Sequence, residues 1–370
     1  MKNNKIMIIA NDTTYTYNLR KELLEEFIKK GNDVIVVATK DKYAEEIKGM
    51  GIMIINIDIF RHGTNPCSDL IFFFRILWVL MNNKPNIVFT FNIKPNIYGG
   101  IACNLLNLPF IPNITGLGGA LVNDGIIKMI TKLLYKFGIL GVNEVLFQNQ
   151  DNKNYFMSEK IIGKQKESYT LPGSGINLDK INFNDYPKDE VVIKFLTVCR
   201  IMKDKGVDEL LNSIKHIKKI FGSKVEFYIA GSYDDLTYKT IFEEMVHTNY
   251  MTYLGQVNNV PKLMKDFHCI IHPSYHEGIS NVLLEAGAIG RPVIASDIPG
   301  CRETFIDGES GFAVKVRDSN DLISKIEQFI NLPYETKKEM GKINRAHVEK
   351  NFDRKIVVKK YIECIEKYAK

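Results

Sequence analysis

Short runs of apolar, mostly β-branched residues alternate with amphipathic stretches along most of this chain, and this alternation restricts the fold more than any other feature. The runs at residues 5–10 and 33–39, for example, are each followed by an amphipathic stretch, at 17–31 and 42–51. Apolar runs of this length predict strands buried on both faces, whereas a period near 3.6 residues predicts helices. Strands that alternate with helices predict parallel sheets covered by helices on both faces, which is an α/β fold.

The alternation is interrupted at residues 171–190, where Gly, Pro, Asn and Asp are frequent and no hydrophobic period is visible. Such a composition predicts an interdomain linker. The alternation then resumes with apolar runs at 193–199, 224–231 and 269–274. Because a chain of 370 residues is also too long for one ordinary core, we expect two doubly wound domains in series.

Composition excludes several classes of protein. The most apolar segment, Leu70–Leu80, is about half as long as a bilayer-spanning helix and contains Arg75, so we expect no membrane span. The first residues are typical of a strand and not of a signal peptide. The six cysteines form no CxxC or Cys/His cluster, which predicts free thiols in a reducing compartment. No two aspartates stand two positions apart, so no DxD metal site is predicted, and the histidines are expected to be mostly structural or exposed.

The net charge of +6 lies almost entirely in the N-terminal half of the chain. An excess of this sign predicts an anionic partner there, such as a phosphate or a membrane surface. Dense basic clusters with interleaved aromatic residues are absent, so we do not expect binding to nucleic acid.

Glu277 and Glu285, with seven residues between them, follow the apolar run 269–274. In open parallel sheets ligands bind beyond the carboxyl ends of the strands, so both carboxylates are candidates for a ligand site. A carboxylate accepts hydrogen bonds from the hydroxyl groups of a sugar or a ribose. Two solvated acids near the start of a helix account for the same spacing equally well.

Between these glutamates, Ser280 suits the N-cap of a helix that begins at Asn281. The N–H groups of Ser280, Asn281 and Val282 would then point out of the helix start, where the partial positive charge favours an anion such as a diphosphate. Gly278 would let the backbone pass close to that ligand.

Two basic residues, Arg200 and Lys205, follow the apolar run 193–199 and would lie at the mouth of the same sheet. Both could reach a diphosphate, the guanidinium as a fork and the ammonium as a point charge. A solvated basic turn is the competing interpretation, and it is the better one for either residue taken alone.

Polar residues also follow two strands of the predicted N-terminal sheet. Asp12, Thr13 and Thr14 follow the first strand and suit contact with a hydroxylated or phosphorylated ligand, although a simple Asx-type turn into a helix explains them as well. Lys94 follows the run 86–91 and could meet an acceptor phosphate.

The loop at residues 113–125 contains Thr115, Gly116 and three further glycines, which indicates a close approach of the backbone or strained turns. It is not a GxGxxG motif, and no such motif follows the first strand, so a dehydrogenase is not expected.

The next predicted helix, residues 124–139, places Lys128, Lys132 and Lys136 on one face at intervals of four residues, with Ile, Met and Leu on the others. A basic, largely apolar helix can rest on an anionic membrane or hold a lipid diphosphate. A packed helix with a solvated lysine face is the competing interpretation.

These stretches resemble the retaining glycosyltransferases of family 4. The likeness is most specific in residues 196–316, with "VCRIMKDKG", "HPSYHEGISNVLLEAG" and the E-x7-E pair. In the N-terminal half, "YNLRKELLEEFIKKGNDVIVVA", "FNIKPNIYGG" and "NITGLGG" resemble the subgroup that acts on polyprenyl-diphosphate-linked sugars, one bacterial member of which adds N-acetylgalactosamine to an undecaprenyl-diphosphate sugar.

The resemblance implies a GT-B fold, in which two Rossmann-like domains face a central cleft. We assign residues 1–173 and the C-terminal helix 352–370 to the acceptor-binding domain, and residues 174–351 to the nucleotide-sugar-binding domain. Acceptor contacts are expected from Asp12, Thr13, Thr14, Lys94, Thr115, Gly116, Lys128, Lys132 and Lys136.

For the donor, the resemblance implies that Arg200 and Lys205 bind the diphosphate and stabilise its leaving charge. Glu277 would contact the transferred sugar and act as a catalytic residue with those two cations. Glu285 would hold the ribose hydroxyls. The donor would be wrapped by Gly278, Ile279, Ser280 and Asn281.

The implied reaction is a retaining hexosyl transfer, of EC 2.4.1 type, that needs neither a metal nor another cofactor. A hexose or N-acetylhexosamine would move from a UDP-sugar to a polyprenyl-diphosphate-linked saccharide during assembly of a bacterial surface polysaccharide or glycan. The enzyme would be cytoplasmic and peripherally bound to the inner face of the cytoplasmic membrane. A sugar-nucleotide-binding protein without transfer activity, or a UDP-sugar epimerase on the same fold, are the alternatives.

Overall fold

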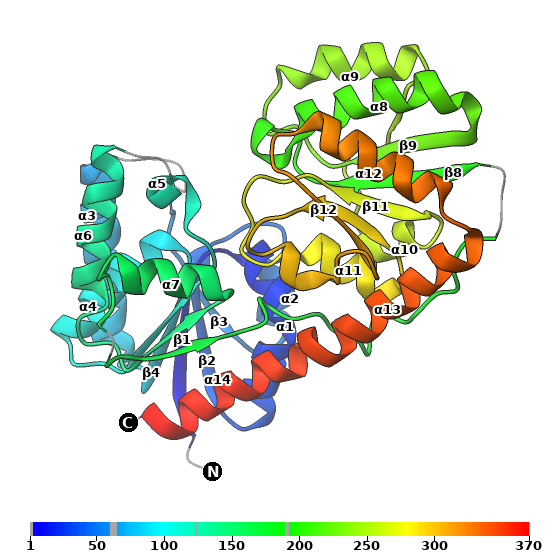
Figure 1. Ribbon diagram of the computed structural model, residues 1–370. Helices are drawn as coiled ribbons and strands as arrows, with labels where there is room; N and C mark the ends of the chain where they lie inside the picture. The colour runs from blue at the N-terminus through cyan, green and yellow to red at the C-terminus, as the bar shows by residue number, and fades with distance from the viewer. Residues whose placement is uncertain (1–2, 60–64, 123–124, 164, 189–191, 370) are drawn as a thin grey trace. The chain divides into compact units, whose positions relative to one another are not determined.

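The computed structural model describes residues 3–59, 65–122, 125–163, 165–188 and 192–369 (Figure 1). The chain divides into two compact units, residues 1–174 with 355–370 and residues 175–354. Each unit holds one parallel sheet with helices on both faces, so the predicted α/β fold of two doubly wound domains is confirmed. The boundaries expected from the sequence, residues 173 and 352, lie a few residues from those of the structure.

The N-terminal sheet has the strand order β3-β2-β1-β4-β5-β6-β7, with every pair parallel. The apolar runs become its strands because both faces of the sheet are buried. The strands are β1 (Lys5–Asp12), β2 (Asp33–Thr39), β3 (Met53–Asn56), β4 (Ile87–Phe91), β5 (Phe110–Ile114), β6 (Glu144–Phe147) and β7 (Glu167–Thr170).

The helices of this unit form two layers. One face of the sheet packs against α3 (Pro66–Asn83), a π-helical turn η1 (Pro95–Gly99), α4 (Gly100–Leu105), α5 (Gly118–Val122), α6 (Ile126–Gly138) and α7 (Gln150–Ser158). The other face packs against α1 (Thr13–Lys29), α2 (Ala44–Gly49) and α14 (Arg354–Tyr368).

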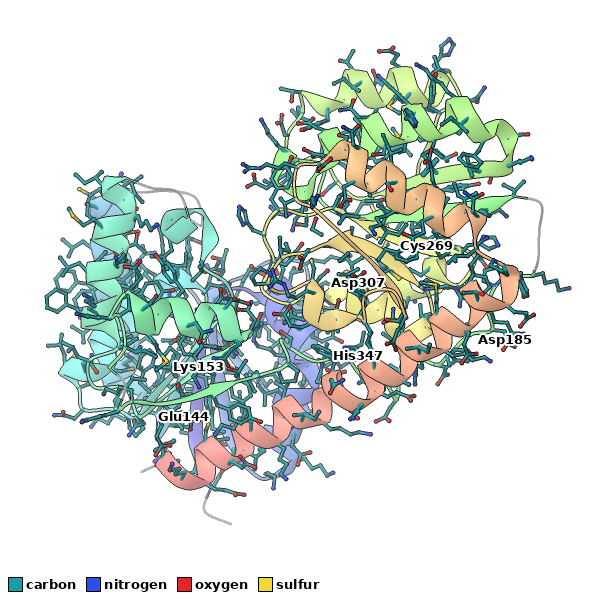
Figure 2. All side chains as sticks on the ribbon, in the orientation of Figure 1. Glu144, Lys153, Asp185, Cys269, Asp307 and His347 are labelled. Atoms are coloured by element: carbon teal, nitrogen blue, oxygen red, sulfur yellow. The ribbon has the colours of Figure 1, made fainter. Side chains whose placement is uncertain are left out.

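The last helix, α14, returns to the N-terminal unit and covers one face of its sheet (Figure 1). Tyr361 is buried against the rings of Phe89 and Phe91, and its hydroxyl accepts a hydrogen bond of 2.6 Å from the Asn113 side chain. At the sheet, Glu144, labelled in Figure 2, pairs with Lys360 at 2.7 Å. Residues far apart in the sequence therefore share one core.

The C-terminal sheet has the strand order β10-β9-β8-β11-β12-β13, again with every pair parallel. Cys269, labelled in Figure 2, marks its buried central strand β11. The strands are β8 (Ile193–Val198), β9 (Val225–Ala230), β10 (Thr252–Tyr253), β11 (Cys269–His272), β12 (Val293–Ser296) and β13 (Gly311–Val314).

Helices cover both faces of this second sheet as well. One face carries α8 (Val207–Phe221), α9 (Tyr238–His247) and α12 (Ser319–Asn331). The other carries α10 (Val260–Met264) and α11 (Asn281–Ile289), and α13 (Tyr334–Phe352) packs on α11. Three short 3-10 turns complete the unit, η2 (Lys203–Lys205), η3 (Gly222–Lys224) and η4 (Arg302–Thr304). Within the part of the chain that the structure covers, no helix is both long and apolar enough to cross a bilayer.

The segment after β8 first forms the turn η2, and α8 starts only at Val207. Gly206 separates the two with a left-handed φ of 68°, and a Cβ at this position would lie 2.0 Å from the Pro273 carbonyl oxygen. The glycine therefore lets the turn that carries Lys205 approach the segment that follows β11.

Candidate functional site

The start of α11 is built as the sequence predicted. Ser280 is the N-cap, and its hydroxyl accepts a hydrogen bond from the Leu283 N–H. The prediction that the Ser280 N–H is available to an anion is wrong, because this group donates to the Gly300 carbonyl at 2.8 Å. The N–H groups of Asn281 and Val282 belong to the first turn, where a helix offers no internal acceptor, and they remain candidates for an anion.

Glu277 lies in the loop between β11 and α11 and is held from two sides. Its Oε1 lies 2.7 Å from Lys205 Nζ and 2.9 Å from His272 Nε2, and the Glu277 and Lys205 side chains are each 16% exposed. Burial would raise the pKa of Glu277, but the hydrogen bond with His272 and the charge of Lys205 outweigh it and hold this pKa well below its usual range. Glu277 is therefore ionised at neutral pH although it is largely buried.

His272, the last residue of β11, is a part of the site that sequence reasoning missed. Its Nε2 faces Glu277 and also lies 3.1 Å from Ser280 Oγ. Because an ionised carboxylate can only accept hydrogen bonds, Nε2 carries a hydrogen that it donates to Glu277. His272 thus links the strand, the loop carboxylate and the helix cap in one buried network. Its position at the end of a strand and five residues before Glu277 is the only sequence signal for this role.

Arg200 follows β8 but does not join this network. Its guanidinium forms an ion pair of 2.8 Å with Asp234, and both side chains are more than one-third exposed. The half-buried Cys199 lies within electrostatic range of Arg200, Lys205 and Glu277, and burial raises the pKa of its thiol to about 12. Arg200 and Lys205 therefore both lie near Cys199 at the carboxyl end of β8. Arg200 pairs with Asp234, whereas Lys205 pairs with Glu277.

Glu285 lies in the second turn of α11 and is half-buried. Among the residues that the structure describes, it has no hydrogen-bond or ion-pair partner. Burial raises its pKa to about 7, and the charge of Arg354 opposes this only in part. A half-buried carboxyl group without a hydrogen-bond partner is suited to hydroxyl groups of a ligand.

The candidates after β1 are already engaged within the fold. Asp12 is the N-cap of α1 and accepts a hydrogen bond of 2.7 Å from the Tyr15 N–H, as the competing interpretation of an Asx-type turn also predicted. Thr13 is buried and its hydroxyl donates to the Asp41 carboxylate, whereas Thr14 is half-buried.

The candidates after β4 and β5 also have partners. Lys94 forms an ion pair of 2.6 Å with Asp69, which accepts a second hydrogen bond from Tyr98 at 3.0 Å. Thr115 Oγ1 lies 3.4 Å from the Asn92 amide, and Gly116 has a positive φ of 158°. Any anion that meets Lys94 would therefore compete with Asp69 for its charge.

On α6 the exposure of the two kinds of side chain differs from the competing interpretation of a solvated lysine face. Lys128, Lys132 and Lys136 are half-buried, and Lys132 pairs with Glu159, the C-cap residue of α7, while Lys128 lies 6.0 Å from the Tyr155 ring. The exposed side chains are apolar, and Ile126 and Met129 are more than three-fifths exposed. The competing interpretation of a solvated lysine face is therefore wrong, because apolar residues occupy the outward positions, and contact of the lysines with an anionic membrane or a lipid diphosphate stays a prediction.

No group of three or more metal-ligating side chains occurs among the described residues. A hollow of about 430 Å³ lies in the N-terminal unit and is lined by Asn104, Phe137 and Leu140 among others. It contains none of the candidate residues, so it does not mark the site built around Glu277.

Comparison with known proteins covers most of the chain. The family "Glycosyl transferases group 1" matches residues 179–347, and the family "Glycosyl transferase 4-like" matches residues 5–149. The sequence is 24% identical to the N,N'-diacetylbacillosaminyl-diphospho-undecaprenol alpha-1,3-N-acetylgalactosaminyltransferase of Campylobacter jejuni, over 99% of each chain. It is 26% identical to the capsular polysaccharide biosynthesis glycosyltransferase CapM of Staphylococcus aureus, over 96% of this chain and 95% of the other.

Among solved structures, the Anabaena protein HepE in complex with UDP and glucose is similar in fold, with a TM-score of 0.78 at 13% identity. The likeness covers 98% of this chain and all of the other. Each half of the chain therefore matches a glycosyltransferase family.

Proposed function

The chain belongs to the group 1 glycosyltransferases with the GT-B fold, and on this basis we propose that it transfers a hexosyl or N-acetylhexosaminyl residue from a UDP-sugar to a polyprenyl-diphosphate-linked saccharide. The observation that carries the proposal is the end-to-end similarity to a transferase whose name specifies an undecaprenyl-diphosphate-linked sugar. The product would serve the assembly of a surface polysaccharide or glycan.

The donor diphosphate would be bound by Lys205, Arg200 and the first N–H groups of α11. Lys205 and Arg200 lie at the carboxyl end of β8, and the helix start supplies a partial positive charge beside them. Glu285 offers an acceptor without a partner for the ribose hydroxyls, and Glu277, kept ionised, offers one for the transferred sugar. Lys205, Arg200 and the positive end of α11 would together stabilise the charge on the leaving diphosphate without a metal.

The proposed step retains the configuration at the anomeric carbon. The bond from this carbon to the phosphate oxygen breaks, and the acceptor hydroxyl oxygen bonds to the same face. The leaving phosphate oxygen takes the acceptor proton, so no side chain is assigned as a base. The acceptor is a lipid, so the enzyme would work at the inner face of the cytoplasmic membrane.

The test is a screen for UDP release with several UDP-sugars, with and without an undecaprenyl-diphosphate-linked saccharide. Acceptor-dependent release with one donor, unchanged by a metal chelator, is expected, and nuclear magnetic resonance of the product should show the donor's anomeric configuration. Sugar conversion without acceptor would instead identify an epimerase. Binding of UDP without turnover would identify a non-transferring binder, and either result would contradict the proposal.

Lys205→Ala should lower kcat/KM for the UDP-sugar by about a hundredfold or more, because it removes a preorganised charge beside the leaving diphosphate. Lys203→Ala is the matched control, since Lys203 is an exposed lysine of the same turn η2. Its kinetics should stay close to those of the wild type. Equal kinetics of all three proteins would contradict the assignment of Lys205.

A further inference from the structure

Two helices of the N-terminal unit expose most of their large apolar side chains to solvent. Both α3 and α6 pack against η1 and α4 on the same face of the sheet (Figure 1). We call the exposed apolar side chains of these two helices the α3–α6 apolar face, which comprises Leu70, Ile71, Phe74, Trp78, Met81, Ile126, Ile127, Met129, Ile130, Leu133 and Phe137. More than half of the exposed large apolar side chains of the described residues belong to it.

The spacing of these residues is helical on both elements. On α3, Phe74 and Trp78 are 57% and 66% exposed, whereas Phe72 and Ile76, which lie two positions before each of them, are buried in the core. A helix that is apolar on both its inward and its outward side is usually covered on both sides, either by protein or by a membrane. Large exposed apolar patches mark sites of interaction with proteins or membranes.

The charges around this face decide between the possible occupants. The two helices carry Arg75, Lys128, Lys132 and Lys136 against the acid Asp69, and the neighbouring Glu159 pairs with Lys132. Lys128 and Lys136 are half-buried, so their apolar stems lie along the protein while their ammonium groups can reach the edge of the face. Anionic headgroups would complement this cationic edge, whereas a second copy of the chain would bring like charges together.

We propose that the α3–α6 apolar face inserts into the headgroup and upper acyl region of an anionic bilayer. This inference rests on the proposed function, which places the enzyme at a membrane, and deepens it by assigning the surface that binds there. Apolar burial supplies the main binding free energy, and the lysines at the edge add electrostatic attraction. Salt should therefore weaken binding only in part, because it screens the charges and not the apolar contacts.

The chain provides its own probe, because Trp78 is its only tryptophan and lies on this face. With the full-length protein, vesicles of phosphatidylcholine and phosphatidylglycerol should shift the Trp78 emission to shorter wavelength and protect it from acrylamide. The double variant Leu133→Ser/Phe137→Ser should bind these vesicles at least about tenfold more weakly, as expected for two buried apolar side chains. Ile220→Ser/Leu236→Ser, which changes residues 57% and 73% exposed in the other unit, should bind like the wild type.

Met81→Ser on α3 is a second, independent test of the same face, and circular dichroism should show that each variant remains folded. Unchanged Trp78 emission with vesicles, or equal binding of the Leu133→Ser/Phe137→Ser variant, would overturn the inference. So would protection of Trp78 without vesicles in a protein that sediments as a dimer, because a second copy would then cover the face. The Leu133→Ser/Phe137→Ser variant should still turn over a short-chain, water-soluble acceptor. If the wild type itself shows no turnover of this acceptor, the transfer reaction is refuted and the membrane result is unaffected.

Discussion

At the scale of single residues, one ring nitrogen of His272 faces both a carboxylate and a helix cap. It lies 2.9 Å from Glu277 and 3.1 Å from Ser280 Oγ. The bond to Glu277 contributes to the low pKa of that carboxyl group and holds it in one position. His272 is therefore a positioning residue in the proposed donor site, since it acts through Glu277 and not on a ligand.

His272→Ala should lower kcat/KM by about tenfold to a hundredfold, which corresponds to the loss of one hydrogen bond to a charged group. It should also raise the pKa of Glu277, so the acidic limb of the pH profile of kcat/KM should move to higher pH. His272→Gln keeps an N–H donor and should restore part of the rate and the position of that limb. Equal losses in both variants without a shifted limb would assign His272 to packing alone.

Replacing Glu285 by glutamine should raise the stability of the protein at high pH but weaken its binding of UDP. Its pKa is raised from 4.5 to about 7, so ionisation is opposed in the folded state and not in the unfolded chain. The wild type should therefore lose stability relative to Glu285→Gln as pH rises from about 4.5 through about 7. Urea unfolding at about pH 5 and about pH 8 measures this difference.

The same Glu285→Gln variant should bind UDP more weakly in calorimetry, because an amide offers one acceptor oxygen where a carboxylate offers two. A variant that is more stable at high pH but binds UDP with wild-type affinity would contradict the ribose-binding role of Glu285.

The sequence indicated Lys205, Glu277 and Glu285 because each follows a strand, where parallel sheets bind ligands. It did not indicate His272, because this residue lies within an apolar run and its partner is set by the turn that comes next. It also could not show that the Ser280 N–H is used by Gly300, since that bond joins two loops whose approach depends on the tertiary fold.

At the scale of elements, the turn η2 holds Lys205 against the loop after β11, and Gly206 is the residue that permits this. Gly206→Ala would combine a left-handed φ of 68° with a Cβ 2.0 Å from the Pro273 carbonyl oxygen. Gly31→Ala is a matched control, because Gly31, just after the end of α1, has a left-handed φ of 80° but nothing within 4 Å of the added Cβ.

Both glycine variants should lose the roughly 1–2 kcal/mol that a left-handed alanine costs. Gly206→Ala should lose more, because its backbone must also shift, and it should lower turnover as Lys205 moves from its place. Urea unfolding and kinetics of the two variants check this. Equal destabilisation of both would mean that the approach to Pro273 is not important.

The hydrophobic period predicted most strands and helices of the two sheets but not all. The edge strand β7 was missed, because its sequence Glu167–Thr170 is polar and lacks an apolar run. The helical segment after β4 begins as the π-helical turn η1 and continues as α4, and periodicity does not distinguish these two hydrogen-bond registers. On α6, apolar residues occur on both sides, so the period alone could not decide which side faces outward.

At the scale of the whole molecule, α14 makes the N-terminal unit depend on the last residues of the chain. Tyr361→Ala should destabilise this unit by about 3–5 kcal/mol, since it removes a buried ring. Phe329→Ala is the matched control, because Phe329 is fully buried in the C-terminal unit. Differential scanning calorimetry should show each variant lowering a different transition, and a common shift of one transition would contradict two separately stabilised units.

The linker and the two-domain organisation could be predicted, because the loss of periodicity at residues 171–190 is a local signal. The burial of Tyr361 against β4 could not, because it depends on contacts between segments some 270 residues apart.

The path of α14 also sets an order of events during protein synthesis. The strands of the N-terminal sheet leave the ribosome first, but α14, which helps to cover one of its faces, leaves after residues 175–354. Until then, Phe89 and the apolar residues around it lack their final cover, while all of residues 175–354 have already emerged. The C-terminal unit can therefore close its core on the ribosome, whereas the N-terminal unit is completed only once α14 has emerged, with its exposed face a target for chaperones in the interval.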